Sequence, residues 1–322
     1  MRIGTNPEKE NFKKIRYKLH RVIIPVYIPD EDHVYFKDLD KVFKENINSL
    51  LKTIDKNQTN ITIINNNSKK EVTDYIDKLL QDKLIDKHIK YGENYGKVYS
   101  ILQEARASYE DFITIADADV FFFNDWQNQV HRVFNEFNKV GVVGLTPDPN
   151  TAFYCNTSLF FKEWLFVKKG KIVENAELEL FEAGINKKDF FVTKNKNWKK
   201  SQFYLEKNQL KVVVGAGHFA SVYKKEVFTH LPFEKPICVF PGGEFCFLDK
   251  PIDQQGYYRV SLTKAFAYHM GNTIPLWIVD KEQKTTIIES IKRKKTNTSQ
   301  WFSFYAFKSN FLSVLRKFNF YK

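Results

Sequence analysis

Two aspartates separated by one residue are the clearest sign of chemistry in this sequence. They lie in Ala116-Asp117-Ala118-Asp119-Val120, directly after the apolar segment 111–116. Side chains at positions i and i+2 of an extended chain point the same way, so the two carboxylates repel each other. At ~4 Å and an effective dielectric constant of ~20, a charge pair is worth about 4 kcal/mol. A hard divalent cation removes this repulsion and can also hold a diphosphate. We therefore predict Asp117 and Asp119 as metal ligands; the alternative is a strand end where both cap turns.

A histidine farther along the chain offers a third ligand. His269 follows a strand-like stretch in Ala267-Tyr268-His269-Met270-Gly271-Asn272. Imidazole suits Mn²⁺-type cations better than Ca²⁺ or Mg²⁺, so the predicted cofactor is a divalent metal, Mn²⁺ (or Mg²⁺). The alternative is a buried histidine bonded to the backbone. His218, in a glycine-containing segment, is the next candidate, although a structural role is the commoner explanation for it.

Strand-like and helix-like patterns alternate before and after these aspartates. Apolar β-branched runs predict strands, and apolar residues at helical spacing predict helices, over 20–28, 36–54, 60–64, 71–84, 85–91, 96–107, 111–116 and 142–145 in alternating order. Such alternation predicts an α/β, Rossmann-like fold with a mainly parallel sheet and helices on both faces. Ligands of such sheets bind beyond the carboxyl ends of the strands, which singles out the loops 27–34, 65–69, 92–96 and 117–121.

The second half of the chain is less regular. Residues 147–210 are rich in aromatics and lysines and predict loops and extra elements over the sheet. Further on we predict a strand at 211–214, a helix over 221–230, a turn at 241–243 and a strand within 257–266. The domain prediction is an N-terminal extension (1–19), a catalytic domain (20–275, divided into a nucleotide-binding half, 20–120, and an acceptor half, 121–275) and a C-terminal extension (276–322).

Composition and charge exclude several classes of protein. The 322 residues are 43% hydrophobic and 27% charged, with a net charge of +12, which is typical of a globular protein with anionic partners. Residues 1–19 are too charged for a signal peptide, and no apolar run approaches the roughly 20 residues of a membrane-spanning helix. Three cysteines without CxxC spacing disfavour a disulfide framework or a zinc-thiolate site. We expect a cytoplasmic protein.

The order of the motifs resembles that of the nucleotide-sugar glycosyltransferases of the GT-A fold, close to family 2. The resemblance covers about 20–272. After Asn65-Asn66-Asn67-Ser68, where the family usually has Asp-Asp-Gly-Ser, come Asn94-Tyr95-Gly96-Lys97, the Asp117-Ala118-Asp119 motif, Gly215-Ala216-Gly217-His218-Phe219-Ala220, and Gly243-Glu244 thirteen residues before Gly256-Tyr257. Each match is loose by itself, but together, in this order, they are specific.

The resemblance implies roles for individual residues. Pro25, Tyr27 and Asn66 would line the nucleoside pocket, with Asn94 and Lys97 nearby. Asp117 would contact the ribose or the metal, and Asp119 the metal. Where the family's Asp accepts a hydrogen bond from uracil, the carbonyl oxygen of Asn66 can accept it without charge, and charge-assisted bonds are about twice as strong. A UDP-sugar remains the favoured donor.

An inverting transfer needs a general base for the acceptor hydroxyl. The family's Glu-Asp pair reads Glu244-Phe245 here, so Glu244 is the first candidate, presented in a loop above the sheet. Asp249 is the second candidate and Asp253 the third. A surface acid without a catalytic role is the alternative for Glu244.

The C-terminal extension combines aromatic and basic residues. Apolar residues recur at helical spacing and predict one helix face, with cations around it: Phe304, Phe307, Phe311, Leu315 and Phe318, with Lys292-Arg293-Lys294-Lys295, Lys308, Arg316 and Lys317. A basic aromatic helix is typical of an interfacial anchor on an anionic membrane. The alternative is a helix packed on the catalytic domain or on a partner subunit.

These observations predict a metal-dependent, inverting glycosyltransferase of surface polysaccharide or glycolipid assembly. It would act at the inner face of the cell membrane on a saccharide or lipid-linked acceptor, without nucleic acid. A sugar nucleotidylyltransferase is disfavoured because the place of its Gly-rich basic loop is taken by Tyr27-Ile28-Pro29-Asp30-Glu31-Asp32. A nucleic-acid-binding protein would fit the charge, but the sequence has no zinc ligands, RNP aromatics or obvious helix-turn-helix. A scaffold without activity is the third alternative, because a fold does not fix a function.

Overall fold

A computed structural model describes the chain except for residues 1–3, 10–14, 237–242, 280, 290–303 and 318–322. Its centre is a ten-stranded sheet in the order β3-β2-β1-β4-β12-β6-β13-β11-β10-β7. Strands β3, β2, β1, β4, β6, β13 and β10 point one way, and β12, β11 and β7 point the other. The predicted α/β fold with a mainly parallel sheet is confirmed.

The strands of this sheet and of two small additional sheets have the following bounds: β1 His20–Val26, β2 Thr59–Asn65, β3 Lys87–Lys90, β4 Phe112–Ala116, β5 Val120–Phe122, β6 Val140–Gly144, β7 Lys168–Gly170, β8 Val192–Thr193, β9 Lys196–Asn197, β10 Gln202–Lys207, β11 Leu210–Val214, β12 Ala220–Lys224, β13 Tyr258–Ser261 and β14 Ala267–His269. The α-helices are α1 Leu39–Thr53, α2 Lys70–Gln81, α3 Lys97–Ala107, α4 Trp126–Glu136, α5 Thr157–Lys162, α6 Asn175–Gly184, α7 Lys250–Gln254, α8 Leu276–Val279 and α9 Tyr305–Lys317.

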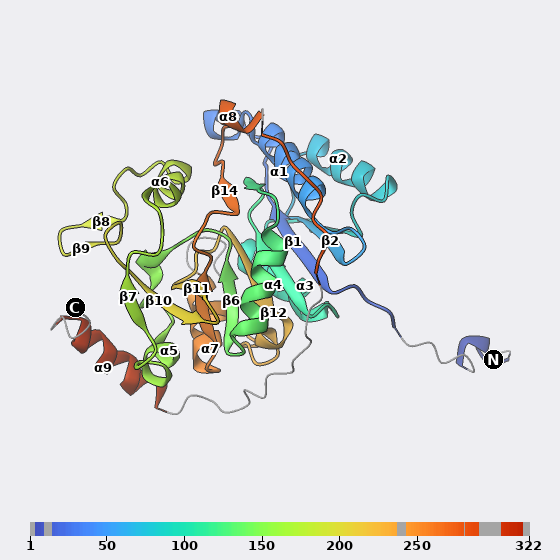
Figure 1. Ribbon diagram of the computed structural model, residues 1–322. Coiled ribbons are helices and arrows are strands. Elements are labelled where there is room, and N and C mark those ends of the chain that lie inside the picture. Colours follow the sequence, from blue (N-terminus) through green and yellow to red (C-terminus); the bar gives the residue numbers. More distant parts are fainter. Residues whose placement is uncertain (1–3, 10–14, 237–242, 280, 290–303, 318–322) are drawn as a thin grey trace.

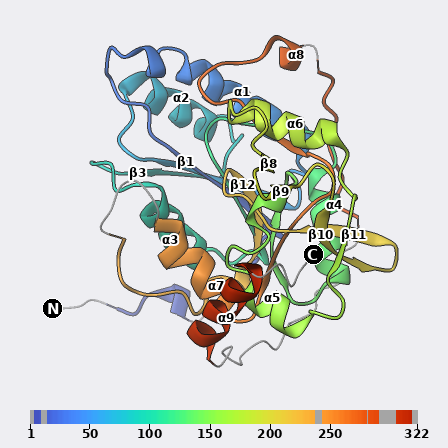
Figure 2. The same ribbon diagram turned by 90° about the vertical axis from the view of Figure 1, so that its left-hand side faces the viewer.

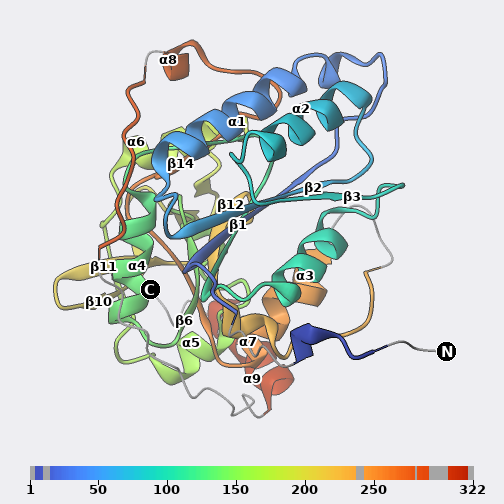
Figure 3. The same ribbon diagram turned by 90° about the vertical axis from the view of Figure 1, so that its right-hand side faces the viewer.

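Helices cover both faces of the sheet. Figure 3 shows α1 and α2 on one side of the strands, with α3 and α7 on the other. One buried cluster joins α1 and α2 to the sheet through residues such as Phe43 and Ile76, and a second joins α3 and α7 to it through Ile101 and Ile252. Burial of an apolar side chain of this size is worth roughly 1.5–3 kcal/mol. The two layers therefore fix the carboxyl edge of the parallel strands, where the site lies.

The elements expected between residues 20 and 145 are present. The helix predicted over 36–54 is α1, that over 71–84 is α2, and that over 96–107 is α3. Each strand prediction in this region also has a counterpart among β1, β2, β3, β4 and β6. Long buried β-branched runs next to amphipathic segments account for this agreement.

One expectation for the second half is wrong. The predicted helix over 221–230 is instead β12, followed by a 3-10 turn, Lys225–Phe228. The strand lies between β4 and β6 and is antiparallel to both, so its residues are buried on both faces, and this burial overrides the helical spacing. The stretch 147–210 holds extra elements, as expected: the helices α5 and α6, and the strands β7 and β10, which extend the edge of the central sheet.

The C-terminal extension returns to the catalytic domain in two places. Residues 282–289 run alongside the start of α4, where the backbone N–H of Asp125 donates to Thr286 Oγ1 at 3.1 Å and that of Ile288 donates to Asp55 Oδ2 at 3.0 Å. Helix α9 packs beside α5, as Figures 1 and 2 both show. Leu312 is the buried residue of α9, so the alternative of a helix packed on the catalytic domain holds for one face of α9.

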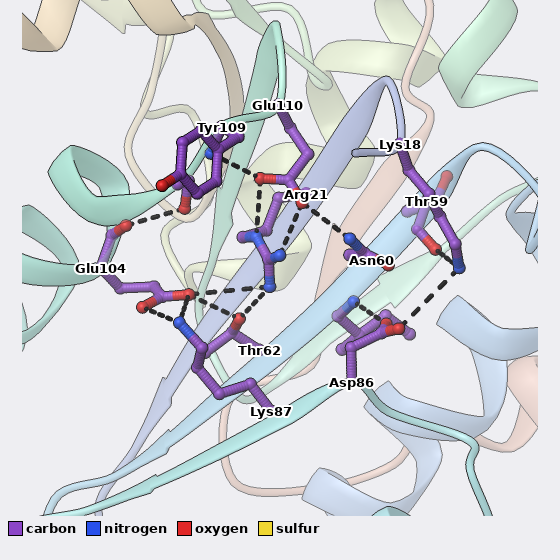
Figure 4. A network of polar contacts seen from close by, with 12 residues as sticks. Lys18, Arg21, Thr59, Asn60, Thr62, Asp86, Lys87, Glu104, Tyr109 and Glu110 are labelled. Atoms are coloured by element: carbon purple, nitrogen blue, oxygen red, sulfur yellow. Dashed lines mark hydrogen bonds and ion pairs between the residues drawn. The ribbon is translucent and has the colours of Figure 1, made fainter. Parts of the chain in front are cut away.

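A buried polar network holds α3 to the sheet (Figure 4). Arg21 of β1 binds Glu110 Oε1 at 2.5 Å and Thr62 Oγ1 at 2.7 Å. Thr62 in turn donates to Glu104 Oε1 of α3 at 2.9 Å, and Lys87 Nζ lies 2.9 Å from the same carboxylate. Because α3 begins at Lys97, this network also fixes the helix end that enters the site.

Replacing Arg21 should cost most of what this network contributes to stability. In Arg21→Gln, Glu110, which is 1% exposed, would keep a buried charge without its cation, and such a loss costs about 3–5 kcal/mol. Exposed Lys70→Gln, which breaks a surface pair with Asp74, is the control and should change stability little. Urea unfolding at neutral pH measures both.

The same pair predicts the pH dependence. Burial raises the pKa of Glu110, but hydrogen bonds from Arg21 and Asn60 outweigh it and hold the pKa below the usual 4.5. The carboxylate's stabilisation is therefore complete above pH 4.5 and is lost as the pH falls below that value. Wild type and Arg21→Gln should converge in acid, and a constant difference at all pH values would contradict this explanation.

Candidate active site

One cavity of about 580 Å³ lies at the carboxyl edge of β1, β2 and β4. All the residues predicted for the nucleotide and the metal line it: Pro25, Tyr27, Asn66, Asn94, Lys97, Asp117, Asp119 and His269. The structure thus brings together five sequence segments, from Pro25 to His269, at the edge where ligands of parallel sheets bind. We call this space the donor cavity.

Three potential metal ligands meet at one end of the donor cavity. One ligand atom each of Asp117, Asp119 and His269 lie within 4.8 Å of one another. His269 Nε2 is 3.3 Å from Asp119 Oδ2, and the buried Asp119 Oδ1 has no hydrogen-bond partner among the described residues. Burial, opposed by His269 and reinforced by Asp117, raises the pKa of Asp119 to about 6. The cluster therefore carries an excess of negative charge, which a cation bound between the three ligand atoms would balance.

A short strand pair brings His269 to the aspartates. Strand β5 starts directly after Asp119, and β14 pairs with it antiparallel, so that His269 faces Val120. The Met270 N–H donates to the Asp119 carbonyl at 2.8 Å. The His269 Nδ1 atom is 3.0 Å from the Gly184 carbonyl at the end of α6, which selects the tautomer with a proton on Nδ1 and leaves Nε2 free as a ligand.

Lys97 lies between the aspartates and Glu244, a residue of the predicted acceptor half. Its Nζ atom lies 2.5 Å from Asp117 Oδ1 and 3.9 Å from Glu244 Oε1. It also donates to the His218 carbonyl at 3.3 Å. Burial lowers the pKa of Lys97, but Asp117 and Glu244 outweigh that effect and raise it, so this ammonium group stays charged. A cation beside the predicted diphosphate position could also bind phosphate oxygens.

The two asparagines of the donor cavity are partly used by the backbone. Asn66 Oδ1 accepts the Tyr95 N–H at 3.0 Å, and Asn94 Oδ1 accepts the Gly96 N–H at 2.9 Å, just before α3. A carbonyl oxygen has two lone pairs, so Asn66 retains one acceptor position and its amide N–H groups for a ligand. Asn94 shapes the turn into α3.

The sequence predicted that Glu244 lies in a loop, and this prediction is wrong. Glu244 lies at the start of a helical turn. Residues 245–249 form a π-helical turn that leads into α7. The predicted turn at 241–243 lies mostly outside the described residues. The Glu244 side chain is 23% exposed and faces Lys97, so it can meet a ligand beside the donor cavity.

Asp249, the second candidate base, is enclosed. Its side chain is 0% exposed and forms an ion pair with the equally buried Arg259 of β13. Its Oδ2 atom binds His218 Nε2 at 2.6 Å and accepts the Tyr154 hydroxyl at 3.0 Å. Burial raises the pKa of Asp249, but Arg259 and His218 outweigh this and lower it. An anionic Asp249 can orient His218, whose side chain is 30% exposed.

Asp253, the third candidate, caps a helix. Its two carboxylate oxygens accept the backbone N–H groups of Thr157 and Ser158 at 2.8 Å, at the start of α5. Tyr305 of α9 donates to Oδ2, also at 2.8 Å. Negative charge at a helix N-terminus is stabilising, and these contacts give Asp253 a structural task.

Several side chains of the site were not found in the sequence. Tyr35 and Phe36 line the donor cavity, yet they lie just beyond the loop 27–34 that the strand pattern singled out. Arg259 is a charged residue inside a fully buried strand. An arginine within a predicted strand is a signal that the sequence offers, because charged residues are almost never fully buried unless they are paired. Gly184 acts through its carbonyl, and nothing in its residue type indicates that.

A family model and two solved structures show which known proteins this chain is similar to. A family model described as glycosyl transferase family 2 matches residues 22–231, and a search of curated proteins gives no match. Among solved structures, S. aureus TarS 1-349 is 12% identical, with 78% of this chain and 60% of that chain covered and a TM-score of 0.45. The mannosyltransferase PcManGT from Pyrobaculum calidifontis, in complex with GDP-Man and Mn²⁺, is 13% identical, with coverages of 77% and 55% and a TM-score of 0.42.

The chain thus spans less than two thirds of the length of these two solved proteins. The family model, in contrast, matches well over half of this chain. The segments that it spans include β1, the Asp117-Ala118-Asp119 motif and the glycine-containing segment before β12. The protein therefore belongs to glycosyl transferase family 2, as its motifs predicted.

Proposed function

We propose that this protein is a glycosyltransferase that takes its sugar from a nucleoside diphosphate sugar, with a UDP-sugar favoured, in a metal-dependent and inverting reaction. The observation that carries the proposal is the convergence of Asp117, Asp119 and His269 at one end of the donor cavity. The cavity extends from these groups to Tyr27, Asn66 and Asn94, which offer an aromatic face and amide groups for a nucleoside.

The three residues fit a divalent cation. They supply two carboxylates and one imidazole, a donor set that suits Mn²⁺ and admits Mg²⁺, and the buried Asp119 Oδ1 has no other partner among the described residues. When bound, such an ion neutralises the negative charge that develops on the departing nucleoside diphosphate. Lys97, 2.5 Å from Asp117, adds a fixed positive charge beside the same position.

We propose Glu244 as the base for the acceptor hydroxyl. Its carboxylate is partly exposed and lies within 3.9 Å of Lys97, whereas the Asp249 carboxylate is fully buried and bonded on both oxygens. The proton of the acceptor hydroxyl passes to Glu244, the acceptor oxygen forms a bond to the anomeric carbon, and the bond to the nucleoside diphosphate breaks. Asp249 holds the ring of His218 beside this position.

We further propose that the acceptor is reached at an anionic membrane surface, as expected for a saccharide or lipid-linked acceptor. No helix in the described part of the chain is long and apolar enough to cross a membrane. Helix α9 exposes Phe307 (72%) and Phe311 (46%), and the turn after α5 exposes Trp164-Leu165-Phe166. Phe311 contacts Phe161 of α5, with 6.2 Å between ring centroids, which links the two exposed groups.

Charge complementarity supports this partner. Lys308 and Lys317 lie on α9 among these aromatics, and each cation near an anionic leaflet contributes about 1 kcal/mol. Of the residues named for the anchor, Phe318 and Lys292–Lys295 lie outside the described residues. The proposed membrane surface therefore consists of the aromatics and cations of α9 together with the exposed turn after α5.

The metal proposal predicts the effect of removing Asp119. Asp119→Ala should abolish transfer and weaken Mn²⁺ and Mn²⁺-dependent UDP binding by about 100-fold or more, since even partners outside the ligand shell contribute 10–100-fold. The exposed Asp32→Ala is the control and should bind like wild type. Calorimetric titration gives the affinities, and circular dichroism checks that the fold is kept. Wild-type activity that survives EDTA would refute the metal assignment.

The base proposal predicts a separate effect. Glu244→Gln should lower the transfer rate by about 10² or more, the scale of general acid–base catalysis, with UDP affinity nearly unchanged. His218→Asn is the informative comparison, because its side chain is partly exposed and its loss leaves the Asp249–Arg259 pair in place. Rates with saturating donor measure both variants. A large loss in His218→Asn with none in Glu244→Gln would show that the Asp249-oriented imidazole is the base.

The membrane proposal predicts salt-sensitive binding to vesicles. Full-length protein should float with liposomes that contain anionic lipid, and the double variant Phe307→Ser/Phe311→Ser should float markedly less. Exposed Leu276→Ser on α8, at 87% exposure, is the matched control. Binding should weaken with salt, since exposed charges are screened over about 8 Å at physiological ionic strength. Equal flotation of all three proteins would contradict the proposal.

A further inference from the structure

A second cavity, of about 480 Å³, lies between α5, α7 and α9. Aromatic residues from separate segments line it, including Tyr154, Phe245 and Tyr305, and amide groups such as that of Asn310 lie between them. Among the described residues, the lining includes Lys250 and Arg316 but no aspartate or glutamate. We call this space the α9 cavity, because α9 forms one wall of it.

The α9 cavity adjoins the proposed base. Phe245, one of its lining residues, directly follows Glu244, and Glu244 lies 3.9 Å from Lys97 of the donor cavity. Tyr154, another lining residue, donates to Asp249 Oδ2 at 3.0 Å. The ring of Tyr154 also meets the His218 ring edge-on, at 6.0 Å between centroids. Glu244 and His218 therefore stand between the two cavities.

Two cations contact Phe153, a lining residue of the α9 cavity: Arg316, which lines the cavity as well, and Lys196, which does not. The Arg316 guanidinium and the Lys196 ammonium each lie 4.5 Å from the centre of the Phe153 ring. Neither forms an ion pair with a carboxylate of the described chain. Burial, reinforced by Arg316 and Lys169, lowers the pKa of Lys196 to about 8. Cations held together without a counter-charge are unfavourable in the free protein, and an anion would relieve this repulsion.

The wall made by α9 is fixed in place. The Tyr305 hydroxyl donates to the buried Asp253 at 2.8 Å, at one end of the helix. Leu312 is 3% exposed in the middle of α9, and Arg316 contacts Phe153 near the other end. Arg316 is thus presented by a helix with three points of attachment.

We propose that the α9 cavity binds the sugar acceptor, and that this acceptor is a saccharide carrying an anionic group, a phosphate or a carboxylate, held by Arg316, with Lys196 at the Phe153 ring adding positive charge nearby. This inference rests on the proposed function, since it names the substrate class for the same reaction. Aromatic faces such as those of Phe245 and Tyr305 suit the apolar faces of sugar rings, and a few polar groups fix the orientation. An acceptor bound there has its hydroxyl beside Glu244.

The test uses the full-length protein with UDP and Mn²⁺ at saturation, so that the donor cavity is filled. Glucose 6-phosphate, glucuronate, glucose and inorganic phosphate are titrated as probes by ligand-observed NMR. We expect glucose 6-phosphate or glucuronate to bind at least tenfold more tightly than glucose. Arg316→Gln should remove most of that preference, because a charge-assisted contact is lost, and Lys196→Gln should reduce it by a smaller factor. Lys317→Gln, an exposed cation on the same helix, should keep it.

A second variant checks the saccharide part of the inference. Phe245 is 44% exposed, so Phe245→Ala should keep the fold while it weakens glucose and glucose 6-phosphate by a similar factor. Equal affinities for glucose and both anionic sugars would overturn the inference. So would unchanged binding in Arg316→Gln, equal losses in Lys317→Gln, or inorganic phosphate binding as tightly as glucose 6-phosphate.

The failure of this inference can be told apart from failure of the proposed function. Asp119→Ala should lose Mn²⁺-dependent UDP binding but keep the preference for the anionic sugar, because Asp119 does not line the α9 cavity. If wild type binds UDP with Mn²⁺ but shows no preference among the probes, only the α9 cavity assignment fails. If it shows the preference but no metal-dependent UDP binding, only the donor proposal fails.

Discussion

Negative charge converges at the carboxyl end of β4, and the site is built around the need to balance it. Asp117, Asp119 and Glu244 approach one another there, and the Lys97 ammonium lies 2.5 Å from the first and 3.9 Å from the last. Two carboxylates at ~4 Å and an effective dielectric constant of ~20 would repel by about 4 kcal/mol. Lys97 offsets part of this cost, and one oxygen of Asp119 has no hydrogen-bond partner in the part of the chain that the structure describes. What remains is a deficit of positive charge where the proposed ion and diphosphate would lie.

The position of Lys97 depends in turn on buried polar contacts far from the cavity. Helix α3 carries Lys97 at its first residue and Glu104 two turns later, and Glu104 is held by Thr62 and Lys87. On the acceptor side, the buried Asp249–Arg259 pair fixes the π-helical turn that begins after Glu244. Breaking a buried pair leaves an uncompensated charge, which is costly. These two ion networks therefore hold the segments that carry Lys97 and Glu244.

The donor half could be predicted from sequence because local patterns determine it. The strand ends after β1, β2 and β4 follow from apolar runs, and the carboxyl-edge rule gathers Tyr27, Asn66 and Asp117 without further information. Their chemical roles stay predictions, but their proximity is a structural fact. The acceptor half was harder, because β12 is made a strand by its two neighbours. Arg259, His218 and Tyr154 meet through contacts between distant segments, which no local period encodes.

A residue without a side chain has unusual weight in this arrangement. The Gly184 carbonyl accepts a hydrogen bond from the His269 imidazole, and a methyl group on Gly184 would lie 2.8 Å from the His269 carbonyl oxygen. Any larger residue at 184 would therefore push α6 and the imidazole apart and release the ring to rotate. A mutagenesis study that selects positions by the chemistry of their side chains would leave out position 184. We nevertheless expect position 184 to tolerate as few substitutions as His269. Helix α6 is thereby coupled to the orientation of the His269 ring beside the aspartates. Substitutions that would adapt this region to another acceptor are therefore restricted at the end of α6.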